Sequence, residues 1–162
     1  MMTAALRVVD GVSELEAALD AGATAEDALG AAIVVIDGSA HRDADSLLHQ
    51  LRVLAALTRD GRRSLAVVGA VDGADWEEHD RIGRVVVRLD IRQLVVVGDD
   101  ARHLASAAGL EGSWDGESVL VADEGQAYDV LRAEIREGDV VLVTLPTGDS
   151  ASFAERMGLT AA

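Results

Sequence analysis

Short aliphatic runs alternate with longer amphipathic segments from residue 33 onward. Five of these runs are apolar along nearly their whole length, which is typical of parallel strands buried on both faces. They are Ile33–Asp37, Leu65–Val71, Leu94–Gly98, Ser118–Val121 and Val140–Thr144. The pattern predicts a three-layer α/β domain, in which helices cover both faces of a mainly parallel sheet of five or six strands.

The segments between these runs carry helix signals. Apolar side chains recur at spacings of three and four residues in the first two segments. They are Leu47, Leu48, Leu51, Leu54 and Ala55, followed by Ile82, Val85, Val86 and Leu89. Asp43 or Asp45 can cap the first of these helices, and Gly61 can end it. A shorter helix is predicted from Ala101 to about Ala108.

Asp123 and Gln126 have the spacing of a capping box, which marks the start of a further helix. The apolar side chains that this helix is expected to bury are Ala127, Leu131 and Ile135. It is predicted to end near Gly138, and a last helix is predicted at Ser150–Met157.

Residues 1–32 have a weaker pattern. Val12–Leu19 and Ala25–Ala31 look helical, and Leu6–Val9 can form a short strand. This segment is therefore expected to be either a helical extension or the first elements of the α/β domain that we place at residues 33–162. No internal repeat, low-complexity stretch or long linker divides the chain.

The charge of the chain restricts its partners. All 14 basic residues are arginine, and 29 acidic residues bring the formal net charge to −15 at pH 7. Such a chain repels phosphate backbones, so we expect neither nucleic acid nor a membrane as a partner. There is no cysteine, no secretory leader and no apolar run of ~20 residues, which makes the cytoplasm the expected location.

Several catalytic and cofactor motifs are missing from the sequence. A P-loop needs a lysine, and this chain has none. Neither the dinucleotide-binding motif Gly-x-Gly-x-x-Gly nor the serine-hydrolase motif Gly-x-Ser-x-Gly follows a predicted strand. The histidines occur singly, without the i+4 partner that a helical zinc site would use. They are His41, His49, His79 and His103. We therefore predict no catalytic residue, no metal site and no cofactor that this chain holds on its own.

Ligands of an open α/β sheet usually bind beyond the carboxyl ends of its strands. In the predicted fold, residues 37–42, 98–100 and 144–148 form loops at that edge. The candidate ligand-binding side chains are Asp37, Ser39, His41, Arg42, Thr144 and Thr147. Acidic and small residues also cap helices and turn the chain, so a purely structural role is the alternative interpretation.

Four segments, in their order and spacing, resemble the C-terminal domain of the Mur ligases, especially of the D-alanyl-D-alanine-adding type. They are Glu78-His79-Asp80-Arg81-Ile82-Gly83-Arg84, Leu94-Val95-Val96-Val97-Gly98 with Ala101-Arg102, Gly112-Ser113-Trp114-Asp115-Gly116-Glu117-Ser118-Val119, and Glu137-Gly138-Asp139-Val140-Val141-Leu142-Val143. The resemblance spans about residues 33–145. It implies a Rossmann-like fold and a relation to the last cytoplasmic ligase of peptidoglycan-precursor synthesis.

The sequence departs from the family pattern where the family handles its ligands. The stretch that matches the family's Asp-x-Tyr-Asn-Ala-Asn-Pro loop, residues 36–46, keeps Asp37 but lacks the tyrosine, the asparagines and the proline. The family's Val-Lys-x-Ser-Arg segment is replaced by residues 143–147, Val-Thr-Leu-Pro-Thr, so two cationic groups are lost. The family's substrate and ATPase domains are not expected to fit into the 32 preceding residues.

The resemblance and its departures leave three functions open. The leading hypothesis is a non-catalytic binding or partner module, and an alternative is the C-terminal component of a split ATP-dependent amide ligase. In that second case a partner protein would supply the ATPase domain, with ATP and Mg²⁺. The third is a small nucleotide- or acid-binding module. His79, expected at a helix surface or in interdomain packing, and Trp114, expected to be a packing anchor, are candidate partner contacts.

Overall fold

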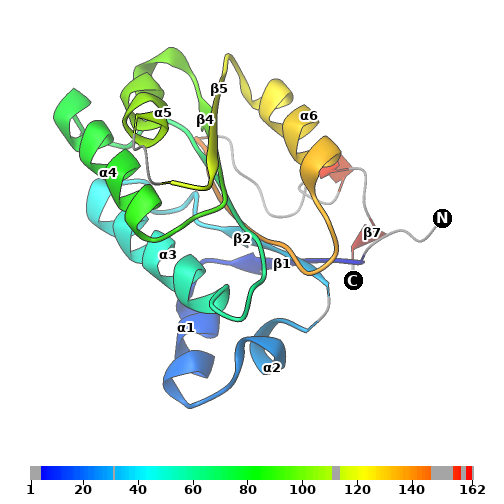
Figure 1. Ribbon diagram of the computed structural model, residues 1–162. Helices are drawn as coiled ribbons and strands as arrows, with labels where there is room; N and C mark the ends of the chain where they lie inside the picture. The colour runs from blue at the N-terminus through cyan, green and yellow to red at the C-terminus, as the bar shows by residue number, and fades with distance from the viewer. Residues whose placement is uncertain (1–4, 31, 111–113, 147–154, 158–159, 162) are drawn as a thin grey trace.

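Every strand of the sheet is parallel to its neighbours. The computed structural model describes residues 5–30, 32–110, 114–146, 155–157 and 160–161. Within these ranges the strands are β1 (Ala5–Asp10), β2 (Ile33–Asp37), β3 (Ser64–Val68), β4 (Gln93–Val97), β5 (Glu117–Val121), β6 (Val140–Thr144) and the two-residue β7 (Thr160–Ala161). Their order across the sheet is β5-β4-β3-β6-β2-β1-β7 (Figure 1). The predicted α/β class with a parallel sheet is confirmed.

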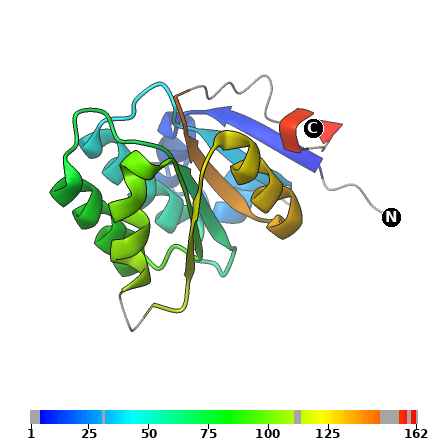
Figure 2. The same cartoon turned by 90° about the horizontal axis from the view of Figure 1, so that it is seen from above.

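Helices cover both faces of this sheet, but unequally. The helices are α1 (Ser13–Asp20), α2 (Ala25–Leu29), α3 (Ala44–Leu57), α4 (Trp76–Arg88), α5 (Arg102–Gly109) and α6 (Glu124–Glu134), with a 3₁₀ turn, η1, at Asp99–Ala101. Apolar side chains of α1 to α5 share one core cluster with one face of the strands. The opposite face packs against apolar side chains of α6 and against Met157. Figure 2 shows α6 on the side of the sheet away from α3, α4 and α5. The layers therefore agree with the prediction.

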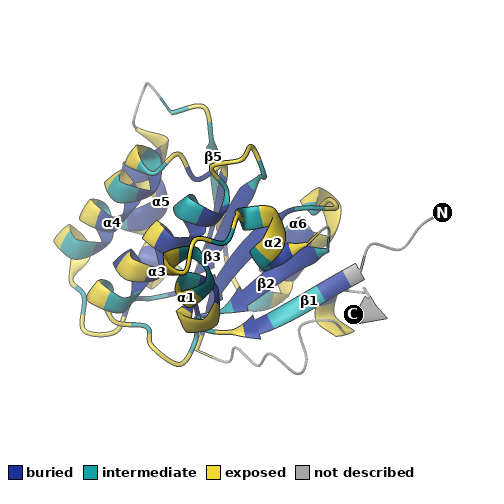
Figure 3. Cartoon of the chain, turned by 90° about the horizontal axis from the view of Figure 1, so that it is seen from below, coloured by how far each residue is buried: buried dark blue, intermediate teal, exposed yellow. Residues whose placement is uncertain are grey.

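The central strands are buried because both of their faces are covered. All residues of β3 and β6 are buried, and so are the first four of β2 and of β4 (Figure 3). The expectation of full burial is wrong for β5, where Leu120 is 46% exposed, because β5 is an edge strand. The strand predicted at Leu65–Val71 ends at Val68 instead, and residues 69–71 form a loop.

Aspartate caps start three of the helices. Asp43, rather than Asp45, caps α3 by accepting a hydrogen bond from the backbone N–H of Ser46. Asp75 caps α4 in the same way, and Asp123 caps α6. The α6 capping box is only half formed, because the Gln126 side chain accepts from Ala122 instead of from the cap residue.

Two predicted helix ends need correction. The helix α6 ends at Glu134, before Gly138, because Ile135 has extended backbone geometry. Ile135, which was expected to be buried by this helix, is only partly buried. The helix α3 ends at Leu57 with Thr58 as its cap, before the glycine predicted to stop it. In the last predicted helix, residues 155–157 are helical, and residues 150–154 lie outside the described ranges.

The N-terminal segment contributes a strand to the same sheet. The predicted strand is confirmed as β1, which pairs in parallel with β2 from Leu6 opposite Ile33 to Asp10 opposite Asp37. The two predicted helices correspond to α1 and to a shorter α2. Their buried leucines, Leu15 and Leu29, join the core on the same face as α3. No helix within the described ranges combines the length and the apolar character needed to cross a bilayer.

Candidate functional site

The carboxyl ends of β2, β6 and β3 lie side by side near the middle of the sheet. After β2 the chain enters α3, on one face, whereas after β6 it continues through Leu145, which belongs to the core cluster of the other face. Neighbouring parallel strands whose connections leave in opposite directions form the switch point at which open α/β sheets usually bind ligands. This edge is therefore the candidate functional site.

The loop after β2 is closed onto β6 by its own hydrogen bonds. The Asp37 carboxylate accepts from the backbone N–H of Ser39 at 3.0 Å. The Ser39 hydroxyl donates to the carbonyl of Val143 at 3.4 Å and accepts from the N–H of Leu145 at 3.1 Å. Two of the predicted ligand-binding residues thus lie together, and their polar groups already hold the strand ends in place.

Arg42, the one cation of this loop, is also engaged. Its guanidinium lies 3.4 Å from the Asp72 carboxylate, and its carbonyl accepts from the N–H of Asp72 at 2.8 Å. These contacts join the loop after β2 to the loop after β3. His41, beside it, is exposed. Hydrogen bonds from the Ser46 hydroxyl and backbone N–H lower the pKa of Asp43, the adjacent cap.

The remaining candidates of the site are less accessible. Thr144 at the end of β6 is 3% exposed, and its carbonyl accepts from the N–H of Gly69 at 3.0 Å. A side chain at Gly69 would place its Cβ 3.3 Å from Pro146, so the loops after β3 and β6 approach closely. Thr147 lies outside the described residues.

Gln50 on α3 was not predicted as a site residue, although its side chain is hydrogen-bonded to the loop after β2. Its side chain, 5% exposed on α3, donates to the carbonyls of Gly38 at 3.2 Å and His41 at 3.3 Å. A Cβ on Gly38 would lie 2.8 Å from the Gln50 Oε1, so the amide and the glycine fit each other. A polar residue beside the apolar face of a helix is normally expected to be exposed to solvent. The hydrophobic pattern therefore did not predict that Gln50 is buried.

Replacing Gln50 with alanine is expected to lower the free energy of unfolding by about 1–3 kcal/mol, because the carbonyls of Gly38 and His41 lose the hydrogen bonds that tie this loop to α3. Urea denaturation measures the loss, and hydrogen exchange at the His41 amide reports on loosening of the loop. His49→Ala, on the same helix but half exposed and paired with Glu16, is the control and should change stability by less than about 0.5 kcal/mol. Equal losses in both variants would contradict a role for Gln50 in holding the loop.

Tyr128 and Arg156 also lie near this edge and were not predicted. Tyr128 on α6 is 4% exposed, and burial raises the pKa of its hydroxyl, against a hydrogen bond with Arg156 that lowers it. The guanidinium carbon of Arg156 is 5.2 Å from the centre of the Tyr128 ring, and Arg156 also lies 3.8 Å from Glu124. The two residues are 28 positions apart, so local patterns could not join them.

The structure corrects the expectation for His79. It is 4% exposed rather than at the helix surface. Its Nε2 accepts from the N–H of Val71 at 3.2 Å, and its Nδ1 lies 2.7 Å from the carbonyl of Asp75. One neutral tautomer satisfies both contacts, since Nδ1 then donates and Nε2 accepts. His79 therefore fastens the loop between β3 and α4 and has no free ring nitrogen for a partner.

Trp114 has the packing role expected of it. Its indole N–H donates to the carbonyl of Ile91 at 2.9 Å, and its ring is partly buried against the core of the α1 to α5 face. A Cβ at Gly116 would lie only 2.2 Å from the ring. Among the described residues, no group of three or more histidine or acidic side chains is placed to hold a metal ion.

A family model described as "Mur ligase, glutamate ligase domain" matches residues 23–144. The chain belongs to the Mur ligase family. The matched range contains β2 to β6 and the whole loop after β2, and it ends where β6 ends. It also begins before α2, so the family likeness reaches into the segment before residue 33.

Curated relatives place this Mur ligase domain closer to one branch of the family. It is 43% identical over 127 residues to a UDP-N-acetylmuramoyl-tripeptide--D-alanyl-D-alanine ligase of Mycobacterium leprae, covering 68% of this chain and 25% of that protein. A ligase of the same name from Mycobacterium tuberculosis H37Rv is 42% identical over 133 residues, covering 70% and 26%. The chain thus spans about a quarter of the length of these relatives.

Solved structures support the fold of this Mur ligase domain. A murein peptide ligase from Psychrobacter arcticus superposes with a TM-score of 0.59 at 14% identity, covering 80% of this chain and 28% of that one. MurF from Acinetobacter baumannii gives a TM-score of 0.51 at 18% identity, covering 73% and 25%. At these identities the likeness concerns the fold alone.

Proposed function

We propose that this Mur ligase C-terminal domain serves as a binding or partner module and does not catalyse ligation by itself. The observation that carries the proposal is the closed state of its candidate site. The Ser39 hydroxyl is bonded to β6, and the Arg42 guanidinium is paired with Asp72. A ligase of this kind must stabilise the charge of ATP and of an acyl phosphate, which requires free cations or metal ions.

The partner in this proposal is a protein that supplies the ATPase domain. The carboxyl edge of the sheet would face it, because the loops after β2, β3 and β6 converge there. The second candidate function is a C-terminal component of a split amide ligase, in which that partner provides ATP and Mg²⁺. It is favoured by the identity above 40% to proteins named UDP-N-acetylmuramoyl-tripeptide--D-alanyl-D-alanine ligase.

One mixing experiment separates the two functions. The chain is added to a D-alanyl-D-alanine-adding Mur ligase that lacks its own C-terminal domain, and association and ATP turnover are measured by sedimentation and phosphate release. The proposed partner module is expected to associate without raising turnover. A rise in turnover would establish the split ligase instead, and absence of association would contradict both functions.

Matched variants locate the docking edge in the same experiment. Ser39→Arg places a bulky cation in the loop after β2 and is expected to weaken association at least about tenfold, since it disrupts the fit at the edge. Arg52→Gln, on the exposed face of α3, is the control and should leave association unchanged. Equal effects of the two variants would show that the carboxyl edge is not the docking surface.

A further inference from the structure

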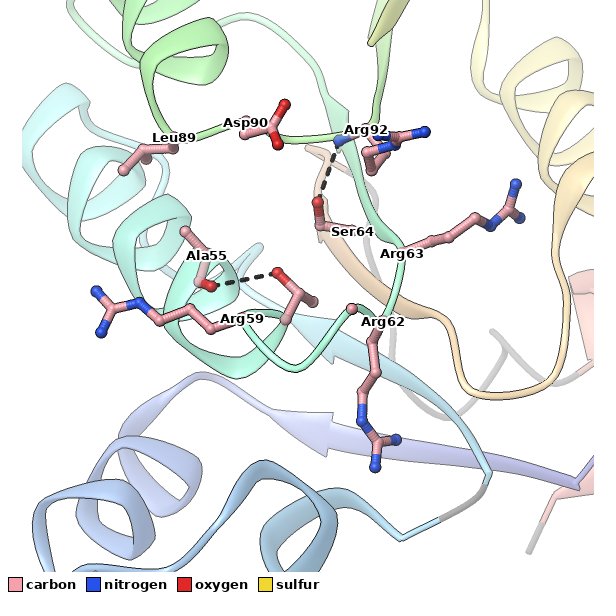
Figure 4. Close-up of a pocket in the computed structure, with 10 residues that line it drawn as sticks. Ala55, Arg59, Arg62, Arg63, Ser64, Leu89, Asp90 and Arg92 are labelled. Atoms are coloured by element: carbon pink, nitrogen blue, oxygen red, sulfur yellow. Dashed lines mark hydrogen bonds between the residues drawn. The ribbon is translucent and has the colours of Figure 1, made fainter. Parts of the chain in front are cut away.

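A cavity of about 460 Å³ opens at the amino ends of β3 and β4, at the opposite edge of the sheet from the candidate site (Figure 4). Its charged lining consists of Arg59, Arg62, Arg63, Arg92 and Asp90. The whole chain has 14 basic residues and 29 acidic ones. Among the residues that line this cavity arginines outnumber carboxylates four to one, whereas in the whole chain acidic residues are in excess.

Two of these arginines are fixed by the protein itself. Arg62 lies 3.0 Å from the Asp60 carboxylate and donates to the carbonyl of Gly30 at 2.7 Å. Arg63 donates twice to the Asp139 carboxylate, at 3.1 and 2.6 Å. These pairs hold both arginine stems in place at the wall of the cavity, and the pairing neutralises much of their charge.

The other two arginines are free. Arg59 and Arg92 are exposed, and neither guanidinium has a hydrogen-bond or ion-pair partner among the described residues. Figure 4 shows them on opposite sides of the cavity, Arg59 beyond the end of α3 and Arg92 just before β4. Asp90 at the rim is the one carboxylate that opposes them.

We propose that this cavity binds a small anion that carries phosphate groups, with Arg59 and Arg92 as its principal ligands. Guanidinium groups form paired, charge-assisted hydrogen bonds with phosphate oxygens, and long arginine stems can turn toward a ligand. The volume lies in the range of small-molecule sites. An enclosed anion with two or more charges would bridge the two free cations, whereas an acidic peptide would need an extended groove. This site goes beyond the proposed function, since it lies away from the docking edge.

Inorganic pyrophosphate is the probe, and calorimetry with thermal unfolding is the measurement. At about ten times the dissociation constant, pyrophosphate is expected to raise the Tm by about 4 °C. Arg59→Gln and Arg92→Gln are each expected to weaken binding about tenfold, because each removes a charged hydrogen-bonding partner. Asp90→Asn is expected to tighten binding severalfold, since it removes the opposing charge.

Arg52→Gln is the matched control, because it removes the same charge from an exposed position of α3 that does not line the cavity. Arginines also stabilise the carboxyl ends of helices, so each variant is judged by the change that pyrophosphate causes and not by its own Tm. Equal weakening in the control and in Arg59→Gln would overturn the proposal, as would no binding at about 10 mM.

Two further probes define the ligand class. Adenosine diphosphate and uridine diphosphate are compared with pyrophosphate. Equal affinity would show that the phosphates alone are recognised, and higher affinity would indicate an additional contact with the nucleoside. An oligoglutamate peptide that binds while pyrophosphate does not would overturn the small-anion site in favour of an acidic protein partner. Association at the carboxyl edge is measured separately, so its failure leaves this test unaffected.

Discussion

Replacing Gly83 with alanine is expected to lower the free energy of unfolding by about 2–3 kcal/mol. On helix propensity alone the change would be favourable by ~1 kcal/mol. The packing reverses the sign, because a Cβ on Gly83 would lie 2.3 Å from the carbonyl oxygen of Leu104 and 3.0 Å from the Cβ of Ala107. The Leu104 carbonyl oxygen belongs to the backbone of α5, so it cannot avoid the clash by a rotamer change as a side chain could.

Urea denaturation of the two proteins measures the loss. Gly125→Ala is the control, since this glycine is exposed in the first turn of α6 and its Cβ would meet only the Asp123 side chain, at 3.3 Å. That variant should stay within about 1 kcal/mol of the parent protein. A Gly83→Ala protein as stable as the control would show that α4 and α5 move apart readily.

Gly83 shows what a local pattern could and could not predict. The residue belongs to the helix segment that resembles the family, and its helix was predicted from the spacing of Ile82, Val85 and Val86. The reason for the glycine lies in α5, which packs against it, and helix spacing says nothing about which helices touch. Element types follow from periodicity, whereas contacts between elements depend on the order of the strands.

The strand order itself was the part of the fold that local patterns could not supply. The last long strand, β6, lies between β3 and β2 instead of extending the sheet at its edge. This position leaves β5 at the edge, which is why Leu120 is exposed although its strand reads as apolar. Patterns of hydrophobicity reflect burial of each strand and do not record which strand is its neighbour.

The candidate site was predictable only as a location. The general preference for carboxyl strand ends led to Asp37, Ser39 and Arg42, and the structure places Asp37 at the end of β2 and the other two on the loop that follows it. That Arg42 is paired with Asp72 depends on two loops that are 30 residues apart. Gln50 was missed for a related reason, because its burial follows from the path of that loop over α3.

The amino edge of the sheet depends on a second long-range pair. Asp139 is 3% exposed and accepts two hydrogen bonds from the Arg63 guanidinium and one from the backbone N–H of Arg136 at 2.8 Å. The hydrogen bonds with Asp139 hold the pKa of Arg63 above its usual value. A raised pKa means that the stabilisation is fully present below the unfolded-state pKa, and thus throughout the neutral range.

Asp139→Ala is expected to lower the free energy of unfolding by about 3 kcal/mol, because the part-buried Arg63 guanidinium loses its carboxylate partner and keeps only the Glu134 carbonyl, and the N–H of Arg136 loses its acceptor. Arg63→Met in the same background should recover part of the loss, since it removes the unpaired charge while keeping an apolar stem. Asp60→Ala, which breaks the more exposed pair with Arg62, is the control and should cost less than about 1 kcal/mol. A loss from Asp139→Ala no larger than the control would mean that β3 and β6 are joined by their backbone ladder alone. The double variant separates two effects of Asp139→Ala, the unpaired charge on Arg63 and the lost hydrogen bond from the N–H of Arg136. Arg63→Met removes only the unpaired charge, so the recovered stability measures that effect alone.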